Sequence, residues 1–175
     1  ISVYGRTKWE GERFARSITP RYYIVRTSWV YARGRNNFVT KIQRLAAEQT
    51  RLSVVTNEFG SPTYAPDLAE AIAQLLRLKP DAVTAASVAP CGIYHLVNEG
   101  AVSRYEFARA ILDLSGHPDY PLDPIAEYER PARPPAYGAL ANVRAAALGV
   151  RLRGWREALQ TFFIGKGVDL MERLE

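Results

Sequence analysis

Apolar residues along the chain fall into two alternating patterns, short dense runs and longer stretches with helical spacing. Dense runs of β-branched and aromatic residues predict strands at residues 22–31, 52–56, 93–98 and 125–128. Helical spacing predicts helices at residues 4–17, 38–49, 67–78, 103–114, 142–148 and 155–163, the last with a helical tail to residue 175. Asp67 is expected to cap the third of these helices, and Ser103 with Glu106 has the spacing of a capping box for the fourth.

The order of these elements predicts an α/β fold. Strands that alternate with helices are typical of a parallel sheet whose crossovers are helical. Two or three buried strands, however, make a poor sheet by themselves. The chain also opens with Ile1 and carries its single methionine, Met171, near the other end. We therefore expect it to be the later part of a longer protein, with most of the sheet outside it.

Composition and charge narrow the classes of partner. The net charge of +5 comes mostly from arginine, and these arginines are scattered rather than gathered into the stripe typical of nucleic-acid binding. Two explanations stay open, a solvated basic surface and arginines that bind a phosphate-bearing small molecule. No apolar run is long enough to span a membrane. The lone Cys91 cannot form an internal disulfide, which favours a reducing, cytoplasmic location.

Tyr4 and Lys8 form the first candidate for chemistry. They stand four residues apart in a predicted helix, so both side chains lie on one helix face. A phenol is a poor acid at neutral pH, but an ammonium group nearby favours the phenolate. Such a tyrosine can give a proton to a carbonyl oxygen while hydride reaches the carbon. The spacing alone equally fits an ordinary amphipathic surface pair.

Several segments, in the right order, resemble the extended short-chain dehydrogenase/reductases. They are YGRTKWEGE, RTSWVYARGRNNF, EFGSPTYAPDLAEAI, IYHLVNEGAVSRYEFARAI and GWREAL. Within that family the fit is best to the branch that reduces 4-keto-6-deoxy sugars carried on dTDP. Sugar epimerases and dehydratases of the family usually have Asn where this chain has Trp29, whereas the reductase branch has Trp.

The resemblance implies a Rossmann-type parallel sheet interwoven with a small α/β substrate-binding domain. On this basis residues 1–32 and 67–98 are the remainder of the NAD(P)-binding domain. Residues 33–66 and 99–175 would then bind the nucleotide-sugar. The glycine-rich turn that holds the cofactor pyrophosphate does not occur in this chain. We therefore expect the chain alone to bind cofactor poorly and not to turn over.

The resemblance also assigns roles at the first helix and the strand that follows. Tyr4 is expected to be the proton donor to the sugar ketone and Lys8 its helper, with both also contacting the cofactor, NADPH or NADH. Arg26, Thr27 and Ser28 would run beside the nicotinamide. A catalytic Ser or Thr that precedes this tyrosine in the family is not in the chain.

Substrate contacts are implied further along the chain. The residues concerned are Trp29, Asn37, Phe38, Ser61, Pro62, Thr63, Tyr64 and Arg133. Taken alone, Trp29 would better fit a core aromatic. Asn37 and Phe38 open a helix whose free N–H groups could face a diphosphate, and Asn37 equally fits an ordinary helix cap. Residues 61–64 are expected to form a loop that lines the sugar pocket. Pro134 stands where the family usually has a second Arg, a departure that weakens the assignment of Arg133 to phosphate.

Together these features predict NAD(P)H-dependent reduction of dTDP-4-dehydro-6-deoxy-L-mannose by the parent protein. Two alternatives stay open, another nucleotide-sugar epimerase or dehydratase of the family and a non-catalytic, cofactor-binding regulatory subunit. The expected partners are the dTDP-sugar and either the missing N-terminal half or a homodimer mate, with no nucleic acid and no membrane. No metal is expected, because Pro66 stands where some members of the family have an acidic residue that binds magnesium.

Overall fold

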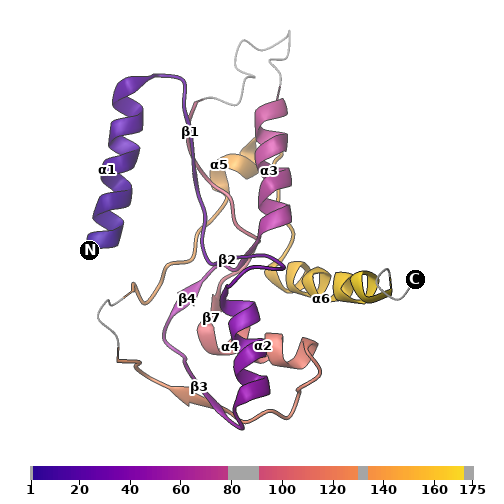
Figure 1. Ribbon diagram of the computed structural model, residues 1–175. Helices are drawn as coiled ribbons and strands as arrows, with labels where there is room; N and C mark the ends of the chain where they lie inside the picture. Colours follow the sequence, from indigo (N-terminus) through magenta and orange to yellow (C-terminus); the bar gives the residue numbers. More distant parts are fainter. Residues whose placement is uncertain (1, 79–90, 130–133, 172–175) are drawn as a thin grey trace.

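A computed structural model describes residues 2–78, 91–129 and 134–171. Its elements form two groups that meet near the middle of the molecule (Figure 1). The upper group contains α1 (Val3–Ile18), β1 (Tyr23–Arg26), α3 (Ala65–Arg77), β6 (Gly92–His95) and α5 (Val143–Ala147). The lower group contains α2 (Phe38–Glu48), β3 (Leu52–Val55), α4 (Arg104–Leu114) and β8 (Leu122–Ile125). Between them lie β2 (Val30–Tyr31), β5 (Thr63–Tyr64) and α6 (Trp155–Met171), with β4 (Phe59–Gly60) and β7 (Val102–Ser103) leading into the lower group.

The strands form four two-stranded pairs rather than one continuous sheet. Three pairs are parallel, β1 with β6, β2 with β5 and β3 with β8, while β4 and β7 are antiparallel. Parallel pairs need long crossovers, and helices supply them here. The prediction of an α/β fold with pieces of a parallel sheet is confirmed.

Each group has its own hydrophobic core. The upper core is built around β6 and α3 and includes Tyr94, Leu96, Ala71 and Leu75. The lower core is larger and is centred on Phe107 of α4, whose ring lies 5.7–6.4 Å from the rings of four other aromatic residues. Those residues are Trp29, Tyr31, Phe38 and Trp155. Both cores are assembled from segments distant in sequence, so each depends on tertiary packing rather than on local structure.

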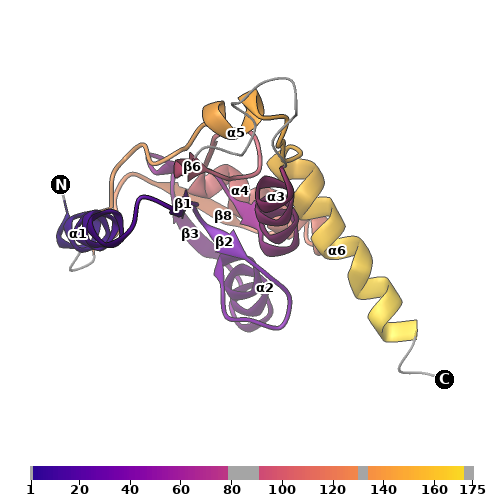
Figure 2. The ribbon, with the colours of Figure 1, turned by 90° about the horizontal axis from the view of Figure 1, so that it is seen from above.

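Helix α1 is the exception to this packing. It stands beside β1, with β1 between α1 and α3, and both views show it separate from the other helices (Figures 1 and 2). None of its residues is buried. Its Glu12 accepts two hydrogen bonds from Arg26 of β1, at 2.7 and 2.6 Å. This bidentate ion pair links α1 to the strand.

The predicted helices form within the described residues, with ends shifted by a few residues, and the capping box of Ser103 and Glu106 is confirmed. The helical tail extends to Met171, and the rest of the predicted tail, residues 172–175, lies outside the described residues. Three other predictions are wrong. The expected strand at residues 22–31 is divided into β1 and β2, because Trp29 adopts a positive φ of 44° that extended backbone cannot contain. The strand expected at 125–128 lies instead at Leu122–Ile125, where it is in register with β3. Asp67 does not cap α3: the cap is Tyr64, and Asp67 lies in the first turn.

Candidate functional site

Tyr4 and Lys8 lie together on the first turns of α1. The Lys8 ammonium is 5.5 Å from the centroid of the Tyr4 ring, so the two side chains share one helix face as the spacing predicts. Tyr4 is 71% exposed, which leaves its hydroxyl accessible to a ligand. Ser2 caps the helix by accepting a hydrogen bond from the Gly5 N–H. The two side chains are therefore close together and accessible to a ligand, and their role in catalysis stays a prediction.

The carboxyl end of β1 is the second part of the site. Parallel strands of open α/β sheets carry their ligands at this end, and Thr27 and Ser28 follow directly after β1. Thr27 is exposed and Ser28 is half-buried. The Arg26 guanidinium is already paired with Glu12, and hydrogen bonds from Arg26 lower the pKa of that carboxyl. Arg26 thus positions α1 against β1, and the cofactor contacts of all three residues stay predictions.

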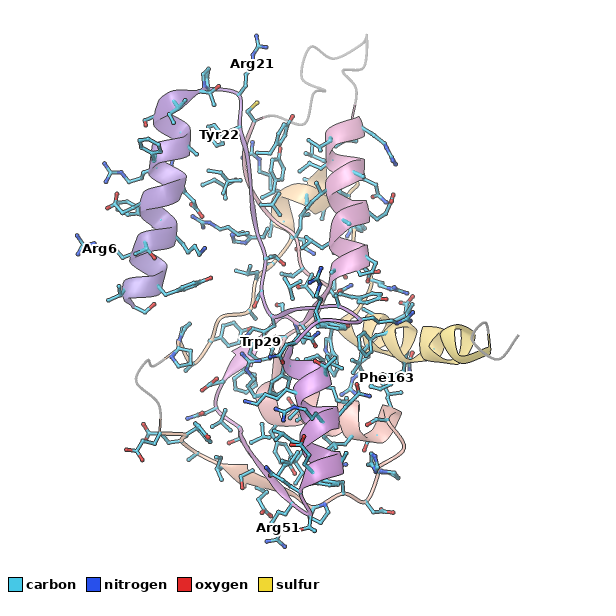
Figure 3. The ribbon with its side chains drawn as sticks, in the orientation of Figure 1. Arg6, Arg21, Tyr22, Trp29, Arg51 and Phe163 are labelled. Carbon is cyan, nitrogen blue, oxygen red and sulfur yellow. The ribbon has the colours of Figure 1, made fainter. Side chains whose placement is uncertain are left out.

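Trp29 lies where the two groups of elements meet (Figure 3). Its backbone has the positive φ that side chains rarely adopt, a conformation that costs about 1–3 kcal/mol and persists only where the surroundings enforce it. The indole packs on Gly60, where a Cβ atom would come within 2.3 Å of the ring. Glycine at position 60 is therefore required by the close approach of Trp29. Such strain is typical of functional positions.

Arg104, the first residue of α4, stacks on two of the aromatic residues singled out from the sequence. Its guanidinium carbon lies 3.7 Å from the centroid of Trp29 and 4.9 Å from that of Phe38. Burial lowers the pKa of Arg104 to about 10. Its Nε is 3.8 Å from Oε2 of the buried Glu58. Trp29 and Phe38, nine residues apart in sequence, thus both contact one cation.

A hollow of about 540 Å³ opens beside Arg104, between α2 and β3; we call it the α2–β3 hollow. Phe38 and Tyr128 provide aromatic walls, β3 provides backbone, and Lys41, Arg104 and Glu58 provide charge. Mostly apolar pockets with a few charged groups are typical of sites for small molecules. Its size and chemistry fit part of a nucleotide, with an aromatic or apolar surface for the base and cations for phosphate.

The other predicted substrate-binding residues have different positions and contacts in the structure. Asn37 caps α2: its side chain accepts from two backbone N–H groups and donates to two carbonyl oxygens, so it has an occupied structural role. The prediction that residues 61–64 form a loop is wrong, because Thr63 and Tyr64 form β5 and all four residues are buried. The Ser61 hydroxyl accepts from the Leu140 N–H, and the Thr63 hydroxyl donates to the Ser61 carbonyl. Arg133 lies outside the described residues.

Sequence reasoning missed the charged residues of the hollow. Arg104 lies inside the capping box of Ser103 and Glu106, so the sequence indicates only an ordinary residue at the start of a helix. One signal could have found it: a cation in the first turn of a helix opposes the helix dipole, so its presence there calls for another reason. Lys41 and Glu58 gave no comparable signal, because nothing in their local sequence separates them from surface charges.

A second missed cluster joins the two cores. Arg153 binds Asp67 through two hydrogen bonds of 2.8 and 2.7 Å, which raise the pKa of Arg153. Asn98 donates to the same carboxylate at 2.7 Å and accepts from the Tyr64 N–H. Asp67 belongs to α3 in the upper group, whereas Arg153 precedes α6 and also binds its Thr161. This cluster fixes the position of the β2–β5 pair that leads out of Trp29.

The described residues were compared with the requirements of a metal site and of a membrane-spanning helix. Among them, no group of three or more His, Cys, Asp or Glu side chains could hold a metal ion. None of the helices in those ranges combines the length and the apolar character needed to cross a bilayer.

Comparison with known proteins adds the family. The model of the RmlD substrate binding domain matches residues 1–165. The chain is 40% identical over 162 residues to the spore coat polysaccharide biosynthesis protein SpsK of Bacillus subtilis, covering 92% of this chain and 53% of that protein. It is 39% identical over 164 residues to dTDP-4-dehydrorhamnose reductase of Mycolicibacterium smegmatis, covering 91% and 47% respectively.

A solved structure agrees with these relatives. The crystal structure of dTDP-4-dehydrorhamnose reductase from Bacillus anthracis, in complex with NADP, superposes with a TM-score of 0.80 at 34% identity. The match covers 94% of this chain and 55% of that one. The chain thus spans about half the length of the curated relatives it matches. Because the family model and these relatives cover nearly all of it, the chain belongs to the family of the RmlD substrate binding domain.

Proposed function

We propose that the protein containing this chain reduces the 4-keto group of dTDP-4-dehydro-6-deoxy-L-mannose and so forms dTDP-L-rhamnose, using NADPH or NADH. The observation that carries the proposal is the Tyr4–Lys8 pair, exposed on one face of α1. A relative from M. smegmatis is named for this reaction, and the B. anthracis structure was solved with NADP.

In this reaction the ketone carbon gains hydride and its oxygen gains a proton. The bound nicotinamide would supply the hydride and become oxidised. The Tyr4 hydroxyl, exposed at the start of α1, would give its proton to the ketone oxygen. The Lys8 ammonium, 5.5 Å from the Tyr4 ring, would stabilise the phenolate that is left and hold ribose hydroxyls.

The rest of the site would position the sugar nucleotide. Trp29 follows β1 in the chain and stacks on Arg104, which lines the α2–β3 hollow. The sugar would lie against Trp29 and the nucleoside in the hollow. Residues 1–32 and 67–98 would then serve the cofactor, and residues 33–66 and 99–175 the substrate. The cofactor side would be completed by the rest of the longer protein or by a second copy. We place the reaction in the cytoplasm, where the single Cys91 stays reduced.

Turnover by the intact protein tests the proposal. The protein is mixed with NADPH and the dTDP-4-keto sugar, and the absorbance of the reduced nicotinamide is followed. We expect steady loss of absorbance and formation of dTDP-L-rhamnose. The control replaces the ketone with dTDP-L-rhamnose, which has no carbonyl to reduce. Absence of turnover with either NADPH or NADH, by protein that binds dTDP, would contradict the assignment.

A further inference from the structure

Arg104 connects two parts of the site that the proposed function uses separately. Its guanidinium stacks on Trp29, the expected contact of the sugar, and the same residue lines the α2–β3 hollow, the expected site of the nucleoside. In a nucleoside-diphosphate sugar, the group that joins sugar to nucleoside is the diphosphate. Arg104 therefore lies where that group would pass.

The hydrogen-bonding of Arg104 differs from that of a structural arginine in the same molecule. Arg153 donates three hydrogen bonds of 2.7–2.8 Å, to Asp67 and Thr161, and its donors are well used. The Arg104 guanidinium has five N–H donors, and among the described residues its one ion pair is the 3.8 Å approach of Nε to Glu58. That distance is too long for a hydrogen bond.

A mostly buried guanidinium that makes few hydrogen bonds is destabilising unless a ligand accepts from it. A quarter of the Arg104 side chain is exposed, so its guanidinium is mostly desolvated but still open to a ligand. Burial accordingly lowers its pKa, as desolvation disfavours the charged form. Stacking on Trp29 and Phe38 holds the guanidinium plane but satisfies no N–H group. The arrangement is that of a preorganised donor.

The chemistry of the expected ligand follows from the shape of the donor. A guanidinium offers parallel N–H pairs that match two oxygens of a phosphate. Glu58 faces the Nε side, which leaves the two terminal nitrogens for an anion away from that carboxylate. Lys41 of α2 lines the same hollow and adds a second cation.

We propose that Arg104 binds the diphosphate of the sugar nucleotide in the α2–β3 hollow, while its stacked face holds Trp29 toward the sugar. The proposal rests on the proposed function for the identity of the ligand. It adds a specificity-determining residue: Arg104 would make the site prefer a nucleoside diphosphate over the nucleoside.

Calorimetric titration of the intact protein with dTDP and with thymidine tests this assignment. Thymidine has the same base and sugar without phosphate. We expect Arg104→Gln to weaken dTDP binding by about 10- to 100-fold, the range for charge-assisted hydrogen bonds, and to leave thymidine binding unchanged. Arg104→Lys, which keeps the charge without the fork, should recover part of the loss. Arg44→Gln is the matched control, because Arg44 lies on α2 but is exposed and paired with Glu48.

Each other outcome overturns the assignment. Equal weakening of dTDP and thymidine, with melting temperature unchanged, would mean that Arg104 only shapes the wall of the hollow. Unchanged dTDP binding in Arg104→Gln would place the phosphates elsewhere. If that variant fails to fold, Arg104→Lys decides: an affinity for dTDP equal to that of the wild type contradicts the proposal, since the lost fork should weaken binding. Wild-type protein that binds no dTDP removes it altogether.

The titration contains no cofactor and no ketone, so it separates this proposal from the proposed function. Protein that shows Arg104-dependent binding of dTDP but no reduction would leave the diphosphate site in place and contradict the reductase. Protein that reduces the sugar but binds dTDP equally well without Arg104 would support the reductase and contradict the diphosphate site.

Discussion

The two regions that carry the site are held together in different ways. The lower region surrounds Phe107 with four aromatic rings and buries residues from α2, α4 and α6 in one core. Helix α1, which carries Tyr4 and Lys8, buries none of its residues and is linked to β1 through the ion pair of Glu12 with Arg26. Four large apolar side chains of α1 besides Tyr4 are exposed, namely Val3, Trp9, Phe14 and Ile18.

The two regions differ in how the positions of their side chains are fixed. Close packing fixes side chains to within fractions of an ångström, and Trp29 is strained and clamped accordingly. Helix α1 buries none of its residues, and its ion pair with Arg26 is only partly buried. The lower region is therefore ordered by its own close packing, whereas the helix that carries Tyr4 and Lys8 has no such packing among the described residues.

The largest expected effect comes from removing the centre of the aromatic core. Phe107 is 1% exposed, and Phe107→Ala should lower the free energy of unfolding by about 3–5 kcal/mol. Phe14→Ala on α1, where the ring is 70% exposed, should change it by less than about 0.5 kcal/mol. Urea denaturation of the intact protein measures both. Similar losses for the two variants would contradict the contrast between the regions.

A smaller effect is expected at the cluster that joins the two cores. Asp67→Asn leaves the mostly buried Arg153 without its carboxylate and should cost about 2–3 kcal/mol, since the pair is partly exposed. Asp123→Asn is the control, because its pair with Arg51 is largely exposed and should be worth less than about 0.5 kcal/mol. Denaturation midpoints compare the two variants. A loss at position 123 as large as that at 67 would show that the cluster has no special role.

The smallest effect on the free energy of unfolding is expected at Glu12, where the change should instead be measurable locally, in α1. Glu12→Gln should cost less than about 1 kcal/mol overall while it accelerates hydrogen exchange of the α1 amides. Hydrogen bonds from Arg26 lower the pKa of Glu12, so this link is fully present above the ordinary titration range of glutamate and is lost as the pH falls through the lowered pKa. Exchange of α1 that is unchanged in the variant would mean that other contacts hold the helix.

Much of the fold could be predicted from the sequence because its periodicities are local. The six helices and the capping box of Ser103 follow from apolar spacing and side-chain caps, which act within a few residues. The break at Trp29 could not be predicted this way. The contacts of its indole with Gly60 and Arg104 form only in the folded chain.

Some residues of the candidate site could likewise be predicted from the sequence, and others could not. Tyr4 and Lys8 were accessible to sequence reasoning, since their spacing places them on one helix face. Gly60 and Pro62 are typical of turns and so predict a loop at residues 61–64, yet Thr63 and Tyr64 pair with β2 and all four residues are buried. Arg104 and Glu58 meet from separate segments, so only the structure brings their charges to one hollow.

The most direct test of the account compares turnover and binding in one variant of the intact protein, Tyr4→Phe. The substitution removes only the hydroxyl that would donate the proton, on a helix far from the core of the substrate region. We predict that reduction of the dTDP-4-keto sugar falls by about 100-fold or more, while calorimetry gives the wild-type affinity for dTDP. Reduction at the wild-type rate by Tyr4→Phe would contradict the assignment of Tyr4 as the proton donor.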